Sequence, residues 1–408
     1  MRFLYSLGIL FFGFLIRVAS LGNTKAEEWI KGRKNWQEKL ENHSNLKGCI
    51  WFHCASLGEF EQGRPLIEKL KKRNPNRPVL LTFYSPSGYE IRKDYPLADC
   101  VCYLPLDTIK NARVFLNLTK PDVAIFVKYE VWHNFFAEIS ARKIPLFMIS
   151  AIFRETQIYF KPYGSWFRKS LKSSNKIFTQ DDKSSRLLNS IGVKQNAVAG
   201  DTRFDRVIEV AENAKSIPVL QDFCANAVTL VAGSTWPADE ELLMKYHQKN
   251  RNLKFIIAPH EIGASHINTL LSKFPRGVKW SKNEEINLNI NVIIVDSIGL
   301  LSTIYKYGNI AYIGGGFGSG IHNTLEPAVY GIPVIFGPNF NKFKEAKGLC
   351  ASNGARSIGN YKELESILDD LLLEAETRLK MGKNAGEYVR LNSGATQIIL
   401  EELNKILL

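Results

Sequence analysis

The segment between residues 314 and 338 carries the residue types best suited to holding a phosphorylated sugar. A glycine triplet follows an apolar run, and a polar cluster then opens a short helical segment that ends at Gly331. The residues of this turn and helix start are Gly314, Gly315, Gly316, His322, Asn323, Thr324, Leu325 and Glu326. Free N–H groups and the dipole at a helix start attract a phosphate, and Glu326 lies one turn on, where a ribose hydroxyl could be reached. The pattern predicts a nucleotide site; the alternative is a tight turn before a buried helix.

A carboxylate near the start of the main body is the second candidate. Ser56-Leu57-Gly58-Glu59 follows directly on the apolar run that ends at Cys54. A carboxylate at the carboxyl end of a strand could remove a proton from an attacking hydroxyl, so Glu59 is predicted to be a general base. The alternative is a capping box, with Ser56 as N-cap and Glu59 three residues further on.

Two further pairs of polar residues follow predicted strands in the second half of the chain. Ser234 and Thr235 precede an acidic helical turn, and Pro259-His260 closes the next strand. The hydroxyls would either cap the helix or bind a phosphate or sugar at its start, and His260 would either contact an anion or hold a loop. Both readings remain open for each pair.

Metal chemistry is not expected. The sequence has no Asp-x-Asp pair and no His or Cys cluster with ligand spacing. A monophosphate leaving group needs less charge compensation than a diphosphate, so helix N-termini and one or two cations would suffice. We therefore predict neither a metal ion nor a cofactor.

Length and charge bound the class of protein. The chain has 408 residues, enough for two domains, and its 53 Lys and Arg against 40 Asp and Glu give a net charge of +13. That excess indicates an anionic partner, such as nucleic acid, acidic lipid or a phosphorylated substrate. The six cysteines form no CxxC pair, which is typical of buried thiols in a reducing compartment.

The first residues form an apolar run, residues 3–16, between Arg2 and Arg17. Fourteen helical residues extend ~21 Å, less than a ~30 Å hydrocarbon core, so spanning would need residues 18–21 as well, with the Arg17 side chain reaching back to an interface. A signal peptide is the rival reading, but basic residues crowd just after the run and favour a cytoplasmic location for that side. We predict an uncleaved membrane anchor, residues 1–22, with the body in the cytoplasm.

A second basic segment lies between Glu155 and Asp181, which enclose no acidic residue. Aromatic and basic side chains interleave there: Tyr159, Phe160, Lys161, Tyr163, Trp166, Phe167, Arg168, Lys169, Lys172 and Lys176. The mixture suits a membrane interface or a phosphorylated lipid, single-stranded nucleic acid, or a solvated helix with one aromatic core face.

Short apolar runs alternate with helical patterns through the rest of the chain. The expected strands are residues 49–54, 79–83, 123–127 and 144–149, and a second set that begins at Ala227. This alternation predicts two doubly wound α/β domains facing across a cleft, with ligands at the carboxyl ends of the strands. We expect domains at residues 23–206 and 207–390, joined near residues 199–216, and a closing helix at 391–408.

This order of motifs resembles the 3-deoxy-D-manno-octulosonic acid (Kdo) transferases of Gram-negative bacteria over essentially the whole chain. Ser56-Leu57-Gly58-Glu59 and the run from His322 to Pro327 carry the resemblance. Supporting motifs are Glu130-Val131-Trp132, residues 200–205 and Gly337-Pro338. The resemblance implies a GT-B fold, CMP-Kdo as donor, a lipid A precursor (lipid IVA) as acceptor, no metal ion, no nucleic acid and the cytoplasmic face of the inner membrane.

The resemblance also implies roles for particular residues. Glu59 resembles the catalytic base, and Pro259-His260, residues 314–316 and residues 323–326 resemble the segments that contact CMP. Family members commonly have Pro-Arg-His where this chain has Pro259-His260-Glu261. After Ile149 the family often shows Asn-x-Arg-x-Ser, whereas in residues 150–154 of this chain the only arginine is shifted to Arg154. We predict that Arg154, with Lys128 as second choice, holds the Kdo carboxylate or an acceptor phosphate.

Three other functions remain open on the sequence. A GT-B glycosyltransferase with a UDP-sugar donor would use the same glycine-rich turn. A sugar-nucleotide epimerase also has two facing domains, although a soluble substrate needs no membrane anchor. A non-enzymatic nucleotide-binding protein would have no use for Glu59.

Overall fold

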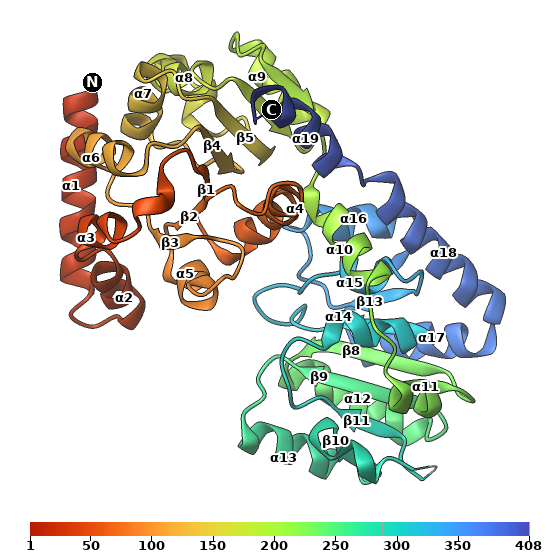
Figure 1. Cartoon of the computed structure of the whole chain (residues 1–408). Helices are drawn as coiled ribbons and strands as arrows, with labels where there is room; N and C mark the ends of the chain where they lie inside the picture. The colour runs from red at the N-terminus through yellow and green to blue at the C-terminus, as the bar shows by residue number, and fades with distance from the viewer. Residues whose placement is uncertain (288, 408) are drawn as a thin grey trace. The chain divides into compact units, whose positions relative to one another are not determined.

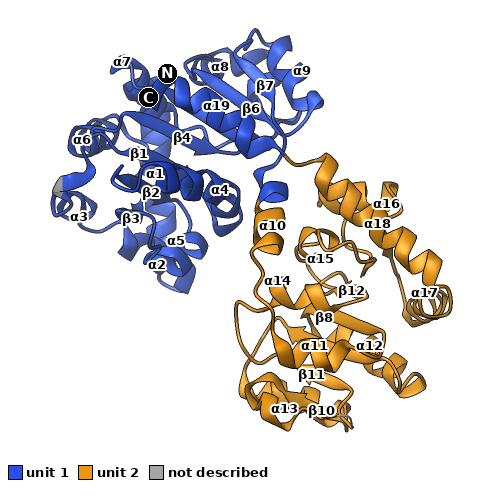
Figure 2. Ribbon diagram, turned by 45° about the vertical axis from the view of Figure 1, so that its right-hand side comes forward, with its two compact units in different colours: residues 1–205, 394–408 blue, residues 206–393 orange. Residues whose placement is uncertain are grey.

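The computed structural model describes residues 1–287 and 289–407 and divides into two compact units (Figure 2). The first unit comprises Met1–Asp205 and Gly394–Leu408, and the second comprises Arg206–Ser393. Leu288 and Leu408, which fall inside the predicted second domain and closing helix, lie outside the described residues. Each unit contains one seven-stranded sheet in which every pairing is parallel. The predicted fold class, a GT-B type pair of doubly wound domains, is confirmed.

The first sheet has the order β3-β2-β1-β4-β5-β6-β7. Its strands are β1 (Ile50–Cys54), β2 (Val79–Phe83), β3 (Cys100–Tyr103), β4 (Val123–Val127), β5 (Leu146–Ala151), β6 (Lys176–Thr179) and β7 (Asn196–Val198). Successive residues of β1 belong to different cores, because Trp51 packs in a cluster on one face while Phe52 packs in a cluster on the other. Burial on both faces explains why these strands read as continuous apolar runs.

Helices cover both faces of this sheet (Figure 1). They are α1 (Arg2–Ala19), α2 (Thr24–Gly32), α3 (Trp36–Glu41), α4 (Leu57–Arg73), α5 (Pro86–Arg92), α6 (Ile109–Thr119), α7 (His133–Ala141), α8 (Ser165–Lys172), α9 (Asp182–Ser190), the start of α10 (Thr202–Glu212) and α19 (Ala395–Leu407). Single 3-10 turns lie at Ser44–Leu46, Ile158–Phe160 and Pro162–Gly164. Phe115 of α6 and Phe135 of α7 pack with Trp51, whereas Leu66 of α4 and Leu400 of α19 pack with Phe52.

The second sheet has the order β10-β11-β9-β8-β12-β13-β14. Its strands are β8 (Thr229–Thr235), β9 (Lys254–Pro259), β10 (Gly277–Lys279), β11 (Val292–Ile294), β12 (Ile310–Ile313), β13 (Val334–Phe336) and β14 (Ala355–Ser357). The helices are α11 (Pro218–Cys224), α12 (Pro237–Lys249), α13 (Ala264–Lys273), α14 (Leu301–Ile304), α15 (Leu325–Ala328), α16 (Lys344–Ala351), α17 (Tyr361–Leu373) and α18 (Ala375–Leu391), with 3-10 turns at Trp280–Glu285 and Tyr305–Tyr307. In both sheets the first strand lies in the middle, so the chain winds outward from it in two directions.

Three local predictions need correction. The strand predicted at residues 144–149 runs from Leu146 to Ala151, two residues later. The connection expected at 199–216 contains a helix, α10. The closing helix expected at 391–408 begins later, as α19 at Ala395, because Gly394 has a φ of 105° that interrupts the helical backbone after α18.

Candidate functional site

Glu59 lies in the first turn of α4, at the carboxyl end of the central strand β1. Ser56 is the N-cap but its side chain accepts no capping bond, while Glu59 Oε2 accepts from the N–H of Ala55 at 2.5 Å. The reciprocal pair of a capping box is therefore not formed. The Glu59 side chain is only 5% exposed, and this burial raises its pKa, against the backbone hydrogen bond and the charge of Lys128.

A second carboxylate shares the surroundings of Glu59. Burial and the negative charge of Glu59 raise the pKa of Glu130 to about 8, and Lys128 opposes the shift. Lys128 directly follows β4 with a left-handed φ of 61°, a conformation that an L-residue adopts only under local constraint. The result is one cation next to two carboxylates at the ends of neighbouring strands. The sequence indicated Glu130 only as part of a supporting motif, since nothing local links it to Glu59.

Buried aromatic residues hold the loop that carries Glu130. Trp132 donates from Nε1 to Nε2 of His53 at 3.0 Å, and His53 Nδ1 contacts Thr82 Oγ1 at 2.9 Å. His53 is fully buried, and burial together with the charge of Arg33 lowers its pKa to about 3. The ring is therefore neutral and accepts from Trp132 at every working pH. Trp132 also stacks on Tyr84 at 4.6 Å, which fixes the position of the loop from two sides.

Arg154 and Lys128 lie in different settings. Arg154 follows β5, is exposed, and its backbone N–H donates to Gln157 Oε1 at 3.0 Å. Lys128 is half-buried and its charge acts on both Glu59 and Glu130. Of the two predicted cations, Lys128 lies close enough to Glu59 for its charge to oppose the rise in the pKa of that carboxyl group.

The glycine-rich turn of the second unit is packed against backbone. A Cβ on Gly314 would lie 2.3 Å from the carbonyl oxygen of Ser234, and a Cβ on Gly316 would lie 2.6 Å from Cα of Gly337. Asp239 of α12 fixes the turn, accepting from Tyr312 Oη at 2.7 Å and from the N–H of Gly315 at 2.9 Å. Close packing between the strand ends therefore requires glycine at these positions, whether or not the turn also binds a ligand.

The helix predicted to follow the turn is only one turn long, α15. Such a helix has little dipole, so a phosphate would rely on individual donors rather than on a helix end. Asn323 accepts from the N–H of Leu325 at 3.1 Å and donates to Glu326 Oε1 at 2.9 Å. Thr324 and Leu325 are fully buried, and Thr324 Oγ1 has no hydrogen-bond partner among the described residues. That hydroxyl lacks the partner that most buried polar groups have.

A cavity of about 340 Å³ brings four of the predicted residues together. Ser234, His322, Asn323 and Glu326 line it, with Tyr305 at its wall. Ser234 has a left-handed φ of 53° at the end of β8. This arrangement unites residues from β8 and from the segment that follows β12, as their positions at strand ends predicted.

His260 does not line this cavity but contacts a residue that does. His260 stacks on Trp236 and on His322, each at 4.6 Å between ring centroids, and Trp236 Nε1 donates to His322 Nε2 at 3.2 Å. Burial, and then the neighbouring His260, lower the pKa of His322. Thr235 is buried, pairs with Pro259 across the sheet and donates to Glu240 at 3.2 Å. Trp236 was not predicted; no local pattern sets it apart from a core residue.

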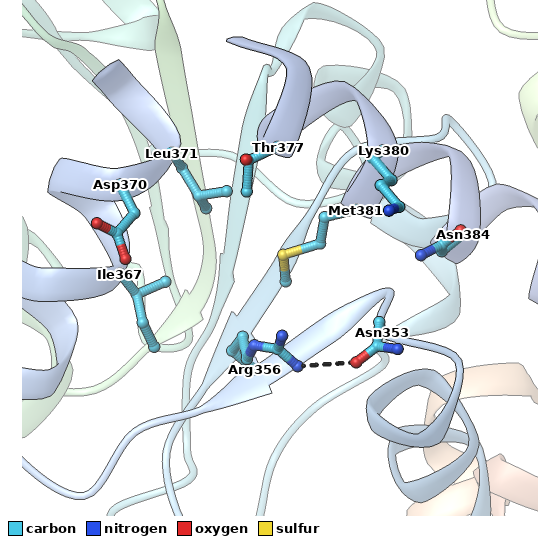
Figure 3. A pocket seen from close by; sticks show the side chains of 9 residues that line it. All are labelled: Asn353, Arg356, Ile367, Asp370, Leu371, Thr377, Lys380, Met381 and Asn384. Atoms are coloured by element: carbon cyan, nitrogen blue, oxygen red, sulfur yellow. Dashed lines mark hydrogen bonds between the residues drawn. The ribbon is translucent and has the colours of Figure 1, made fainter. Parts of the chain in front are cut away.

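A different cavity of the second unit contains none of the predicted residues. It measures about 370 Å³ and lies between α17, α18 and the edge strand β14 (Figure 3). Asp370, Lys380 and Arg356 project toward it, and Arg356 donates to Asn353 at 3.3 Å. Among the described residues no group of three or more His, Cys, Asp or Glu side chains could hold a metal ion.

The fold has relatives among solved structures. A UDP-N-acetylglucosamine 2-epimerase of Neisseria meningitidis superposes with a TM-score of 0.60 at 16% identity, over 87% of this chain and 99% of that one. The corresponding epimerase of Methanocaldococcus jannaschii gives 0.52 at 15% identity, over 84% and 98%. At such identities the likeness concerns the fold alone.

Sequence comparison gives the family. Residues 34–206 match the profile described as 3-deoxy-D-manno-octulosonic-acid transferase (kdotransferase). A 3-deoxy-D-manno-octulosonic acid transferase of Aquifex aeolicus is 31% identical over 340 residues, which cover 81% of this chain and 88% of the relative. Its counterpart in Haemophilus influenzae is 28% identical, over 88% of this chain and 87% of its own. With this similarity along most of its length, the chain belongs to the 3-deoxy-D-manno-octulosonic acid transferase family of glycosyltransferases.

Proposed function

We propose that the protein transfers Kdo from CMP-Kdo to a hydroxyl group of a lipid A precursor, lipid IVA. Membership of the family supports the transfer of Kdo. One observation carries the chemical part of the proposal: Glu59 is a buried carboxylate with a raised pKa at the carboxyl end of the central strand β1. A carboxylate in such surroundings is a stronger base than one in water, because burial disfavours its charged form.

In the proposed step Glu59 takes the proton of the acceptor hydroxyl. The acceptor oxygen attacks the anomeric carbon of Kdo from the side opposite to the phosphate. The bond between that carbon and the phosphate oxygen breaks, and CMP leaves with the electron pair. A single displacement of this kind inverts the anomeric configuration.

For the donor we propose the cavity lined by Ser234, His322, Asn323 and Glu326. Glu326 would accept from a ribose hydroxyl, and the unpaired hydroxyl of Thr324 would donate to the phosphate or to a bridging water. His260, which stacks on His322, would contact the nucleotide. One phosphate group with these donors needs no metal ion, so we propose metal-independent transfer.

The cation that holds the Kdo carboxylate or an acceptor phosphate is a second proposal. Arg154 and Lys128 are the candidates, and the charge interaction between Lys128 and Glu59 favours Lys128. An ammonium group there would bind an anionic substrate and limit the rise in the pKa of Glu59. Transfer by Arg154→Ala with unchanged Michaelis constants for donor and acceptor would leave Lys128 as the cation.

The enzyme is proposed to work at the inner membrane with its body in the cytoplasm and α1 attached to the bilayer. Polar contacts hold the first turns of α1 on the first unit: Arg2 pairs with Glu138 at 3.0 Å, and Tyr5 Oη donates to Asp107 at 2.9 Å. Further along, Gly13 packs against Leu106. A helix held at its beginning and its middle on a folded unit cannot cross a bilayer by itself, so we propose that α1 lies along the membrane surface.

A donor comparison tests the proposed activity. CMP-Kdo, generated in situ, and a panel of UDP-sugars are offered with a tetraacylated lipid A precursor, in the presence of EDTA. We expect a Kdo-bearing product with CMP-Kdo alone and no effect of the chelator. Product from a UDP-sugar instead would assign the protein to the alternative donor, and loss of product with EDTA would contradict the metal-independent step.

A further inference from the structure

A large basic cavity lies beneath α1 in the first unit. It has a volume of about 560 Å³ and is bounded by the C-terminal half of α1, the end of α2 and the loop between β3 and α6. Arg17, Arg33 and Lys34 line it, and its described lining includes no carboxylate. None of the residues proposed for transfer lines it either.

Arg33 is a buried guanidinium without an acidic partner in the part of the chain that the structure describes. It donates to the carbonyl oxygens of Leu104 at 3.0 Å, Trp29 at 3.2 Å and Tyr84 at 2.7 Å. These bonds use three of the five N–H groups of a guanidinium and leave two for another acceptor. Burial lowers the pKa of Arg33 to about 9, because the charge is only partly compensated. An anion in the cavity would compensate that charge.

Two further cations at this cavity form no salt bridge with the described side chains. Arg17 lies in the last turn of α1 and Lys34 follows α2, and both are exposed. The neighbouring Lys31 differs, since it pairs with Glu27. Arg33 is fixed by its three carbonyl acceptors, whereas Arg17 and Lys34 are free to close over an anion from two sides.

Apolar residues complete the cavity and continue onto a lipid-facing surface. Leu10 and Phe14 of α1 form part of its wall, together with Trp36 and Leu106. Both α1 residues also belong to the exposed apolar face of that helix, with Leu7 and Phe11. Cations beside apolar and aromatic side chains, at the end of a helix that lies on a membrane, are suited to the headgroup region of a bilayer.

We infer that this cavity binds the phosphate group of an anionic glycerophospholipid, with Arg17, Arg33 and Lys34 around the phosphate and Leu10 and Phe14 against the acyl chains. The bound lipid joins α1 to the bilayer and fixes the orientation of the first unit. The inference rests on the proposed membrane attachment of α1 but not on the donor or the acceptor.

Binding of a soluble lipid tests this inference. The full chain, in buffer without detergent, is titrated with dihexanoyl-phosphatidylglycerol below the micellar concentration of that lipid. Binding is followed by the change in tryptophan fluorescence, to which Trp29 and Trp36 at the cavity contribute. We expect saturable binding, a loss of at least tenfold in affinity for Arg17→Gln/Lys34→Gln, and no binding of dihexanoyl-phosphatidylcholine. The matched control Lys25→Gln/Lys47→Gln removes the same charge from exposed residues that do not line the cavity.

Other outcomes overturn the inference. An equal loss in the control variant would mean general attraction between a basic protein and an anion. Inorganic phosphate binding as tightly as the lipid would mean an anion site without lipid specificity. Transfer assayed in detergent without phospholipid should be unchanged in Arg17→Gln/Lys34→Gln. If transfer is lost there while binding of CMP persists, the cavity holds the acceptor rather than a phospholipid, and the proposed transferase function still stands.

Discussion

Glu59 and Glu130 share their surroundings, and in both the pKa of the carboxyl group is raised. Burial raises the pKa of both, and the charge of Glu59 adds to the shift of Glu130. Lys128 acts on both carboxylates and stabilises the first negative charge more effectively than a second one. Near neutral pH Glu130 is therefore mostly protonated and adds little negative charge beside Glu59, the proposed base.

The pH dependence of transfer follows from this arrangement. The base must be ionised, so activity should rise with pH through the raised pKa of Glu59. Above about pH 8 Glu130 ionises as well, and its charge opposes binding of the anionic donor, so activity should fall. We expect a bell-shaped profile of kcat/KM whose alkaline limb is absent in Glu130→Gln. An unchanged alkaline limb in that variant would assign it to another group.

Stability should respond to Glu130 in the same pH range. Its pKa is about 8 in the folded state and ~4.3 when unfolded, so its stabilising contribution is complete below pH ~4 and is lost as pH rises through 8. Glu130→Gln should match the wild type at pH 4 and exceed it by up to about 5 kcal/mol at pH 9, as urea unfolding would measure. The control Glu41→Gln changes an exposed carboxylate of the same unit. Equal stability of wild type and Glu130→Gln at both pH values would refute the raised pKa.

The position of Glu59 at a strand end could be predicted from the sequence, because an apolar run, a glycine and a helix start are all local signals. Glu130 could not be found in this way. Its proximity to Glu59 depends on the pairing of β4 with β1 in the sheet. The amino-acid sequence of neither strand indicates which strand it pairs with. The same holds for the stack of Trp236, His260 and His322, which three separate segments supply.

At the scale of elements, the turn between β12 and α15 is tightly packed and is also the proposed binding site for the donor. Its glycines are pressed against the ends of β8 and β13, while the short helix contributes side chains rather than a dipole. The sequence predicted the turn correctly but overestimated the helix, since Pro327 and Gly331 are compatible with helices of several lengths. The start of the closing helix was placed too early for a related reason. Asp205 accepts from Gly394 and Thr396 and starts α19 anew, a contact across almost two hundred residues.

Two substitutions within this turn test whether its glycines are needed for close packing. Gly316→Ala would place a methyl group 2.6 Å from the backbone of Gly337, whereas Gly318→Ala would meet nothing closer than 3.6 Å. We expect the first change to cost about 1–3 kcal/mol of stability and to weaken CMP binding at least tenfold, and the second to change either quantity little. Calorimetric titration with CMP and thermal unfolding measure both effects. Equal behaviour of the two variants would show that the turn adjusts freely.

At the scale of the whole molecule, each unit has its own sheet and its own cores, and each presents polar residues where parallel strands end. The alternating apolar runs were enough to predict this architecture. The weaker strands β6, β7, β10 and β14 were not predicted, because they are short and lie toward the sheet edges, where burial is less complete. The apolar run of α1 predicted a membrane anchor, but its orientation depends on contacts of Arg2 and Tyr5 that no local pattern reveals.

Membrane attachment should depend on the outward face of α1. Leu7 and Phe11 are exposed there, and each apolar side chain buried in the bilayer contributes about 1.5–3 kcal/mol. Leu7→Ser/Phe11→Ser should therefore reduce binding to anionic vesicles by at least a hundredfold in a sedimentation assay while the protein stays folded. Leu373→Ser/Leu391→Ser, which changes exposed residues of the second unit, is the control. Unchanged sedimentation of the α1 variant would show that α1 is not the attachment.

The most direct test of the account compares wild type with Glu59→Gln in transfer from in situ generated CMP-Kdo to a tetraacylated lipid A precursor. Glu61→Gln, on the same helix and paired with Arg92 at 2.9 Å, controls for a lost charge. We predict product from wild type and Glu61→Gln, a fall of about 10²–10⁴ in kcat for Glu59→Gln, and equal binding of CMP by all three. Full activity of Glu59→Gln would contradict the proposed base, and no product from a folded, CMP-binding wild type would contradict the proposed reaction.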